Sequence, residues 1–304
     1  MVGIQLMLLA GAFVALSNYF MRKSIDTGGT TKGFLMVQLF VVTLVAILLN
    51  PVRMHHYDWS LCMTLFGVAG GCVLGVMMAS LGRALETGPP GLTFAALNSS
   101  TVMPSIVMVL VFGVAFGYRF TLYNGLGSLF VVLGLFWAGW SRSSYKPKWL
   151  PFVSTAFFLH VLFLVFLSSR ALFINYPGEN GLFLSFDMDD AKNQWFMPVV
   201  FFTAFLIQTV LFTKAEKRRI APTEFLYGTV GGIANGVGTF FMILATERAT
   251  HMEHAMIYPI FSIMVILLCN LWGQLLYRER VNWWANTLCL LGILVGTVNW
   301  SGLK

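Results

Sequence analysis

The densest group of polar residues within an apolar stretch is the sequence Asn98-Ser99-Ser100-Thr101. Polar side chains inside membrane spans are costly, and they usually face the interior of the protein. Amide and hydroxyl groups at this spacing could hydrogen-bond a hydroxylated or zwitterionic substrate. The alternative is hydrogen bonding between helices, which serine and threonine do routinely in membranes. Asn98, Ser99 and Thr101 are therefore candidate contacts for an organic solute.

A second group surrounds a histidine near the start of a later apolar run. His254 and Tyr258 lie four residues apart, so they would share one face of a helix. A histidine can change its charge near neutral pH, and His254 could therefore couple proton movement to transport. The alternative is a hydrated cluster of histidine and glutamate at the membrane interface. Both residues are candidates to line a cavity, and His254 is also a candidate for proton coupling.

Five further polar residues stand alone in apolar runs, and each is a candidate to face a cavity. They are Asn18, Gln38, His160, Gln208 and Asn235. The strongest candidate is Asn235, because it lies in a glycine-rich stretch at 231–238. Glycines allow helices to approach closely, which is the first explanation for that stretch.

Two glutamates occupy matching places in the two halves of the chain, since a shift of 161 positions superposes Glu86 on Glu247. They could be gating carboxylates on opposite faces of the membrane. The alternative is local ion pairing, of Glu86 with Arg83 and of Glu247 with Arg248.

The composition indicates a multi-pass membrane protein. Of 304 residues, 58% are hydrophobic and 10% are charged, and the mean hydropathy is +0.78. A soluble domain carries about 25% charged residues. The net charge of +7 could suggest nucleic acid. The basic residues are instead scattered over short loops, as orientation signals are, and we expect no nucleic-acid partner.

Known enzyme motifs are missing from the sequence. It contains no G-x-S-x-G, no P-loop and no H-E-x-x-H. Its four cysteines all lie in apolar runs and lack the spacing of a metal site. We therefore expect no enzymatic activity, no catalytic residues, no metal and no cofactor.

Ten apolar runs are long enough to cross a bilayer, which needs about 20 apolar residues per helix. They cover approximately 2–21, 33–50, 60–84, 91–117, 121–140, 149–170, 195–214, 223–246, 252–277 and 283–301. Most connections are short, and the exception is an acidic loop at about 171–194. These runs predict an all-α polytopic membrane protein with ten transmembrane helices.

The same shift of 161 positions reveals an internal repeat. It superposes the glycines at 67, 70, 71 and 75 on those at 228, 231, 232 and 236. Because five helices are an odd number, a second copy must enter the bilayer from the opposite side. Inverted repeats are the usual plan of a secondary transporter, with the site near the midplane between them. We expect one membrane domain made of two repeats, residues 1–145 and 146–304.

Lysine and arginine indicate the orientation. Thirteen of the 19 lie in the loops after the odd-numbered runs, so we expect both termini on the outside.

The segment Tyr277-Arg278-Glu279-Arg280-Val281 precedes the last apolar run. It resembles the Gly-Glu-Arg-Leu signature of the drug/metabolite transporter superfamily, in its EamA-like members with ten helices. Residues 67–116 and 228–277 also look like that family's repeat core. The resemblance implies a monomeric or homodimeric carrier that works by alternating access, with a cavity lined by the first four helices of each repeat.

The sequence favours a secondary transporter for a small neutral or zwitterionic metabolite, such as a sugar, nucleoside or amino acid. An anionic substrate would require basic residues in the cavity. One alternative is a flippase for a lipid-linked sugar or polyprenyl phosphate, and another is a membrane-embedded enzyme or scaffold subunit. The expected partners are a small-molecule substrate and the lipid bilayer. We expect the plasma membrane, which in a bacterium is the inner membrane.

Overall fold

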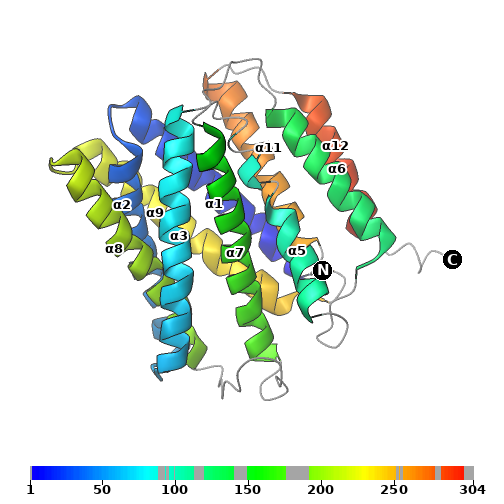
Figure 1. The fold of residues 1–304 in the computed structure, drawn as a ribbon, viewed down its shortest axis with the longest axis horizontal. Helices are drawn as coiled ribbons and strands as arrows, with labels where there is room; N and C mark the ends of the chain where they lie inside the picture. Colours follow the sequence, from blue (N-terminus) through cyan, green and yellow to red (C-terminus); the bar gives the residue numbers. More distant parts are fainter. Residues whose placement is uncertain are drawn as a thin grey trace.

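The computed structural model describes residues 2–87, 93, 96–98, 100–112, 120–139, 149–175, 192–250, 253, 256–277 and 282–297. All regular secondary structure in these residues is helical (Figure 1). The α-helices are α1 (Val2–Asp26), α2 (Thr31–Ile47), α3 (Leu61–Thr87), α5 (Met103–Phe112), α6 (Leu122–Gly139), α7 (Trp149–Asn175), α8 (Phe196–Glu216), α9 (Pro222–Arg248), α11 (Ile257–Tyr277) and α12 (Trp283–Thr297). Three short helical segments are not α-helical: the π-helix η1 (Leu48–Val52) and the 3-10 helices η2 (Ser100–Val102) and η4 (Lys192–Trp195).

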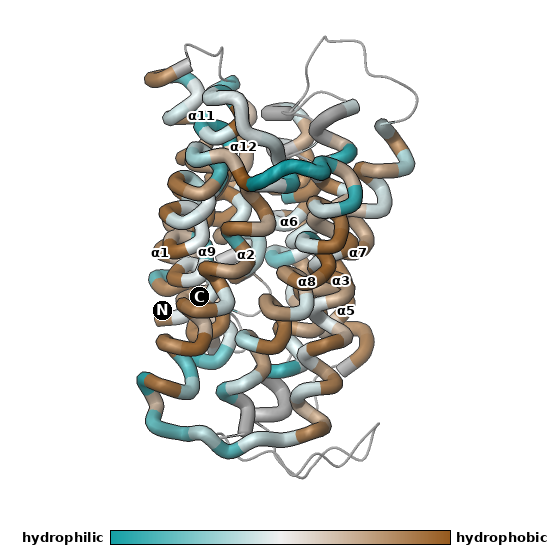
Figure 2. Tube along the Cα trace, turned by 90° about the vertical axis from the view of Figure 1, so that its left-hand side faces the viewer, coloured by the Kyte–Doolittle hydropathy of each residue, from teal (hydrophilic) through white to brown (hydrophobic). Residues whose placement is uncertain are grey.

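Seven helices in the described residues are long and apolar enough to cross a membrane. They are α1, α2 with η1, α3, α7, α8, α9 and α11. Shorter apolar helices lie at Leu122–Gly134 and Trp283–Gly296, in α6 and α12. The most hydrophilic stretches of the chain lie toward the two ends of the bundle (Figure 2). The chain is therefore an all-α integral membrane protein.

The helices form a bundle in which α3 and α7 lie in front of α9 and α1 (Figure 1). The pair α2 and α8 closes one edge, and the pair α6 and α12 lies at the other. We call the end of the bundle that holds the α1–α2 and α8–α9 turns the basic face; it is the upper end in Figure 1. The other end is called the opposite face.

A stripe of glycines on α3, formed by Gly67, Gly71 and Gly75, contacts α8. A methyl group added at Gly71 would lie 2.5 Å from the backbone oxygen of Val200. An equivalent stripe on α9, formed by glycines 228, 232 and 236, contacts valines 37, 41 and 45 of α2. Small residues let helix backbones approach closely in a membrane. The two stripes therefore fix the packing of α3 on α8 and of α9 on α2.

A buried carboxylate joins the turns at the basic face. Glu224 is 0% exposed and accepts hydrogen bonds from the backbone N–H groups of Thr30 and Ala221, at 2.7 and 2.8 Å. The Arg218 guanidinium donates to both of its oxygens, at 2.6 and 3.0 Å. These hydrogen bonds to Glu224 raise the pKa of Arg218 above its ordinary value. A methyl group on Gly33 would overlap the carboxylate, so the contact requires glycine there.

The fourth apolar run is not one continuous helix in its described part. Backbone hydrogen bonding changes to the tighter 3-10 form at η2, before α5 begins at Met103. Pro104 lacks the N–H that would bond to the Ser100 carbonyl, and its ring clashes with that carbonyl in a regular helix. We expected one regular helix over 91–117, and the described part instead contains a 3-10 turn at Ser100–Val102 before α5. The acidic loop expected at about 171–194 lies mostly outside the described residues, because α7 extends to Asn175 and η4 begins at Lys192.

Candidate functional site

A cavity of about 140 Å³ lies inside the bundle, between α1, α2, α3, α7, α8, α9 and α11. Its polar lining consists of the amides of Asn18, Gln38, Asn98 and Asn235, the imidazole of His160, and the hydroxyls of Thr31 and Thr239. The other lining residues are apolar, apart from Gly82, and they include four methionines and three phenylalanines. No lysine, arginine, aspartate or glutamate is among the lining residues in the described part of the chain. The cavity therefore offers hydrogen bonds without a fixed charge.

His160 on α7 is held by two groups from the segment before α5. Its Nδ1 atom lies 2.7 Å from Ser100 Oγ and 3.2 Å from the carbonyl oxygen of Leu97. Ser100 Oγ also donates to that carbonyl, at 2.5 Å. The changed turn at η2 thus brings the Ser100 hydroxyl to α7, and it fixes the imidazole at the cavity wall.

Gln38 on α2 is 5% exposed and lines the cavity. Its Nε2 atom donates to Ser17 Oγ on α1 at 2.7 Å. Its Oε1 atom is buried and has no hydrogen-bond partner. A buried polar atom without a partner is rare, and it calls for an explanation.

The Asn98 region joins helices as well as facing the cavity. Asn98 lines the cavity, but its backbone oxygen accepts from Thr101 Oγ1 at 2.5 Å and from Ser262 Oγ at 3.2 Å. Thr101 is 0% exposed, is hydrogen-bonded to Ser262 of α11 and is not among the lining residues. The position of Thr101 therefore matches the alternative of hydrogen bonding between helices.

Two other candidates are buried away from the cavity. The hydroxyl of Tyr258 on α11 lies 2.6 Å from Ser168 Oγ of α7, and Tyr258 is 2% exposed. Gln208 Nε2 on α8 donates to the backbone oxygen of Gly75 at 3.0 Å, beside the glycine stripe of α3. Neither residue lines the cavity. Ser99, His254 and the side chain of Glu86 lie outside the described residues, so their predicted roles stay predictions.

Glu247 pairs with a residue that the sequence did not single out. Its Oε1 atom lies 2.5 Å from an Nη atom of Arg170, and not beside its chain neighbour Arg248 as the local alternative required. Arg170, the last residue of the predicted apolar run at 149–170, is 3% exposed within α7. Its guanidinium also lies 5.9 Å from the centre of the Phe196 ring. The ion pair thus joins α7 to α9 and contacts the start of α8, at the opposite face.

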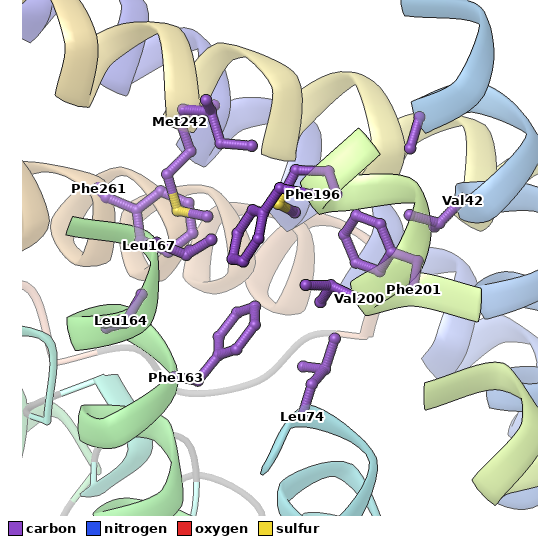
Figure 3. Close-up of a cluster of buried hydrophobic side chains, with 14 of the residues drawn as sticks. Val42, Leu74, Phe163, Leu164, Leu167, Phe196, Val200, Phe201, Met242 and Phe261 are labelled. Carbon is purple, nitrogen blue, oxygen red and sulfur yellow. The ribbon is translucent and has the colours of Figure 1, made fainter. Parts of the chain in front are cut away.

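A large apolar cluster contains much of the cavity wall together with Phe196, whose ring the Arg170 guanidinium contacts. Figure 3 shows its side chains converging from α2, α3, α7, α8, α9 and α11, and they include Leu167, Phe196 and Val200. Toward the basic face the cavity instead reaches Met21, Thr31 and Gly82, which lie near the helix ends. The cavity therefore extends toward the basic face, and packed side chains close it at the opposite face.

Glu253 lies in the connection between α9 and α11 at the opposite face. It accepts hydrogen bonds from the backbone N–H groups of Thr250 at 2.8 Å and of Ile4 at 3.4 Å. Burial raises the pKa of Glu253, but these hydrogen bonds lower it more, so that its pKa lies below its ordinary value. The carboxylate thus stays ionised and ties this connection to the start of α1.

Comparisons with known proteins give a fold and no family. No family model matches the chain, and no curated protein matches it. Among solved structures, 29 chains match. One of them, described as "Crystal structure of protein", is 15% identical and superposes with a TM-score of 0.70, over 100% of this chain and 98% of the other. At that identity the likeness shows a shared fold alone.

Proposed function

We propose that this chain is a secondary transporter that moves a small neutral or zwitterionic organic metabolite by alternating access. The observation that carries the proposal is the central cavity, whose mostly apolar wall carries several polar but uncharged groups, and which extends toward one face while side chains close the other. A carrier must hold its substrate between two gates that open in turn. In this proposal the structure is the state that faces the basic side.

We propose further that ten helices cross the membrane as two inverted repeats of five. The shift of 161 positions superposes α3 on α9, α5 on α11 and α6 on α12, and the order of the helices then pairs α1 with α7 and α2 with α8. The contact of α1 with α9 then corresponds to that of α7 with α3, and the contact of α2 with α9 to that of α8 with α3. The contacts of α2 with α8 and of α6 with α12 each join a helix to its own counterpart, so the same symmetry leaves them unchanged. Such a contact pattern is expected from two-fold symmetry.

The directions of the helices support inversion rather than simple duplication. In Figure 1, α1 and α3 run toward the basic face, and their counterparts α7 and α9 run toward the opposite face. A two-fold axis along the membrane normal would leave counterparts parallel. An axis in the membrane plane reverses them and places the cavity at the interface of the repeats.

The chemistry of the cavity favours a small solute over a lipid-linked sugar or polyprenyl phosphate. Phosphate groups are bound by arginine or lysine in proteins, and the described lining offers neither. The volume of about 140 Å³ is also far below that of a polyprenyl chain. We propose the plasma membrane as the compartment, where a carrier for metabolites would exchange them between cell and surroundings.

Counterflow in proteoliposomes tests the proposal. Vesicles containing the purified full chain would be loaded with one unlabelled solute, and uptake of the same labelled solute would be measured. The panel would hold a neutral sugar, a nucleoside, a nucleobase and a zwitterionic amino acid, with protein-free liposomes as the control. We expect transient accumulation of at least one class. Absence of counterflow for every class, together with transbilayer movement of a polyprenyl phosphate, would establish the flippase instead.

A further inference from the structure

We propose that the cavity recognises a small planar neutral molecule with two N–H or O–H donors, through Gln38 Oε1 and His160 Nε2 as acceptors. This inference rests on the proposed transport function, because it names the substrate class of the same cavity. It is carried by an acceptor without a partner, a fixed imidazole, an uncharged lining and the size of the cavity.

The first acceptor is the buried Oε1 atom of Gln38. Nε2 is engaged with Ser17 Oγ, and Oε1 is a buried atom without a hydrogen-bond partner in a side chain that lines the cavity. Leaving a buried acceptor unsatisfied is unfavourable. A ligand with a donor at this position would remove that penalty.

The second acceptor follows from the hydrogen bonds of His160. The Leu97 carbonyl can only accept, and it receives the Ser100 hydroxyl proton at 2.5 Å. Ser100 Oγ is then an acceptor toward the imidazole Nδ1 atom, at 2.7 Å, and Leu97 O is a second one, at 3.2 Å. On this arrangement we assign the proton to Nδ1. In the neutral imidazole, Nε2 is then an acceptor with a free lone pair.

The remaining walls select a flat, uncharged ligand. Met77, Met242, Phe163 and Phe261 are among the apolar lining residues, and thioethers and phenyl rings make favourable contacts with the edges and faces of aromatic rings. The cavity volume of about 140 Å³ is close to that of an engineered cavity of roughly 150 Å³ that binds benzene. A six-membered heterocycle with two ring N–H groups, such as uracil, fits this size and supplies both donors.

Binding of uracil and 1,3-dimethyluracil to the purified full chain tests the inference. The two rings have the same shape, but the second lacks both N–H donors. We expect uracil to bind wild-type protein roughly tenfold or more tightly than the dimethyl analogue. Gln38→Met keeps the length of the side chain and removes the acceptor, so it should weaken uracil and leave the dimethyl analogue unchanged.

Gln208→Met is the matched control, because Gln208 is also a buried glutamine but does not line the cavity. It should leave the preference for uracil intact, and thermal unfolding would confirm that both variants fold. Equal binding of the two ligands to wild-type protein, or equal loss of both in Gln38→Met, would overturn the inference. If uracil fails to bind while another solute class shows counterflow, the substrate class is wrong and the transport function stands. If no solute shows counterflow, the transport function itself fails.

Discussion

At the scale of single residues, the pair formed by Arg170 and Glu247 shows what burial does to a charge. Arg170 is 3% exposed and Glu247 is 23% exposed. A buried charge that loses its partner is left without compensation, and breaking such a pair costs about 3–5 kcal/mol. We therefore expect Glu247→Gln to lower the free energy of unfolding by about 3–5 kcal/mol in mixed micelles. Adding Arg170→Met to the same chain should restore most of that loss.

Glu216→Gln is the control for this prediction, since Glu216 pairs with Lys32 at 3.3 Å and with Arg218 at 3.4 Å, and these cations are 25% and 35% exposed, against 3% for Arg170. Exposed pairs contribute about 0–1 kcal/mol, so this variant should unfold close to wild type. A Glu247→Gln variant as stable as Glu216→Gln would show that Arg170 does not depend on the carboxylate.

The residue scale is also where the sequence says least. Gln38 and His160 stand out as polar residues in apolar runs, so their type alone made them candidates. Their partners Ser17 and Ser100 come from other segments, and no pattern in the sequence connects them. In the sequence Arg170 looks like a residue at the end of an apolar run. Its burial depends on Glu247, which lies 77 positions away, and the sequence gives no sign of that contact.

At the scale of elements, the glycine stripe of α3 provides a test with its own internal control. A methyl group at Gly71 would lie 2.5 Å from the Val200 backbone oxygen and 2.6 Å from Thr203 Cβ. At Gly70 the closest atom would be 3.5 Å away, which is an ordinary contact. Overpacking typically costs 1–3 kcal/mol, so we expect Gly71→Ala to reduce stability by about 1–3 kcal/mol in thermal or chemical unfolding.

Gly70→Ala should be neutral or slightly stabilising, because alanine is the better helix former by roughly 0.5–1 kcal/mol. If the two variants behave alike, the approach of α3 to α8 is not limited by the backbone contact at Gly71.

Element positions could be predicted from the sequence, because long apolar runs and turn residues mark helices and their ends. The glycine-rich stretch at 231–238 also predicted a close helix contact. Neither the apolar runs nor the glycines say which helix is the packing partner. The glycines of α3 do not identify α8, and those of α9 do not identify α2. The change of turn at η2 was missed as well, although Pro104 was a signal for it.

At the scale of the whole molecule, the bundle is asymmetric although its contacts are paired. The cavity reaches helix ends at the basic face. The opposite face is closed by the apolar cluster of Figure 3, by the hydroxyl contact of Tyr258 with Ser168, and by the ion pair of Arg170 with Glu247. In the proposed arrangement, two repeats with different side chains at equivalent places would give one open and one closed end. A carrier would exchange these states during transport.

Cysteine labelling in sided vesicles tests that exchange. Thr239 lines the cavity on α9 and is 6% exposed, so Thr239→Cys would be introduced after the four native cysteines are replaced. A membrane-impermeant maleimide should label this cysteine from the basic face in wild-type background. Labelling from the opposite face should be slow, and it should become several-fold faster when Glu247→Gln is added, because that change weakens the closed end.

Met21→Cys provides the reference, because Met21 lines the cavity near the end of α1 at the basic face. Its labelling from the basic face should be as fast as that of Thr239→Cys or faster, and Glu247→Gln should reduce it if the two ends open in turn. The reduction is the decisive result, because a pore that merely leaks at the opposite face would gain labelling there without losing it at the basic face. If Glu247→Gln increases labelling from the opposite face and leaves Met21→Cys unchanged, the two ends are not coupled and alternating access is wrong.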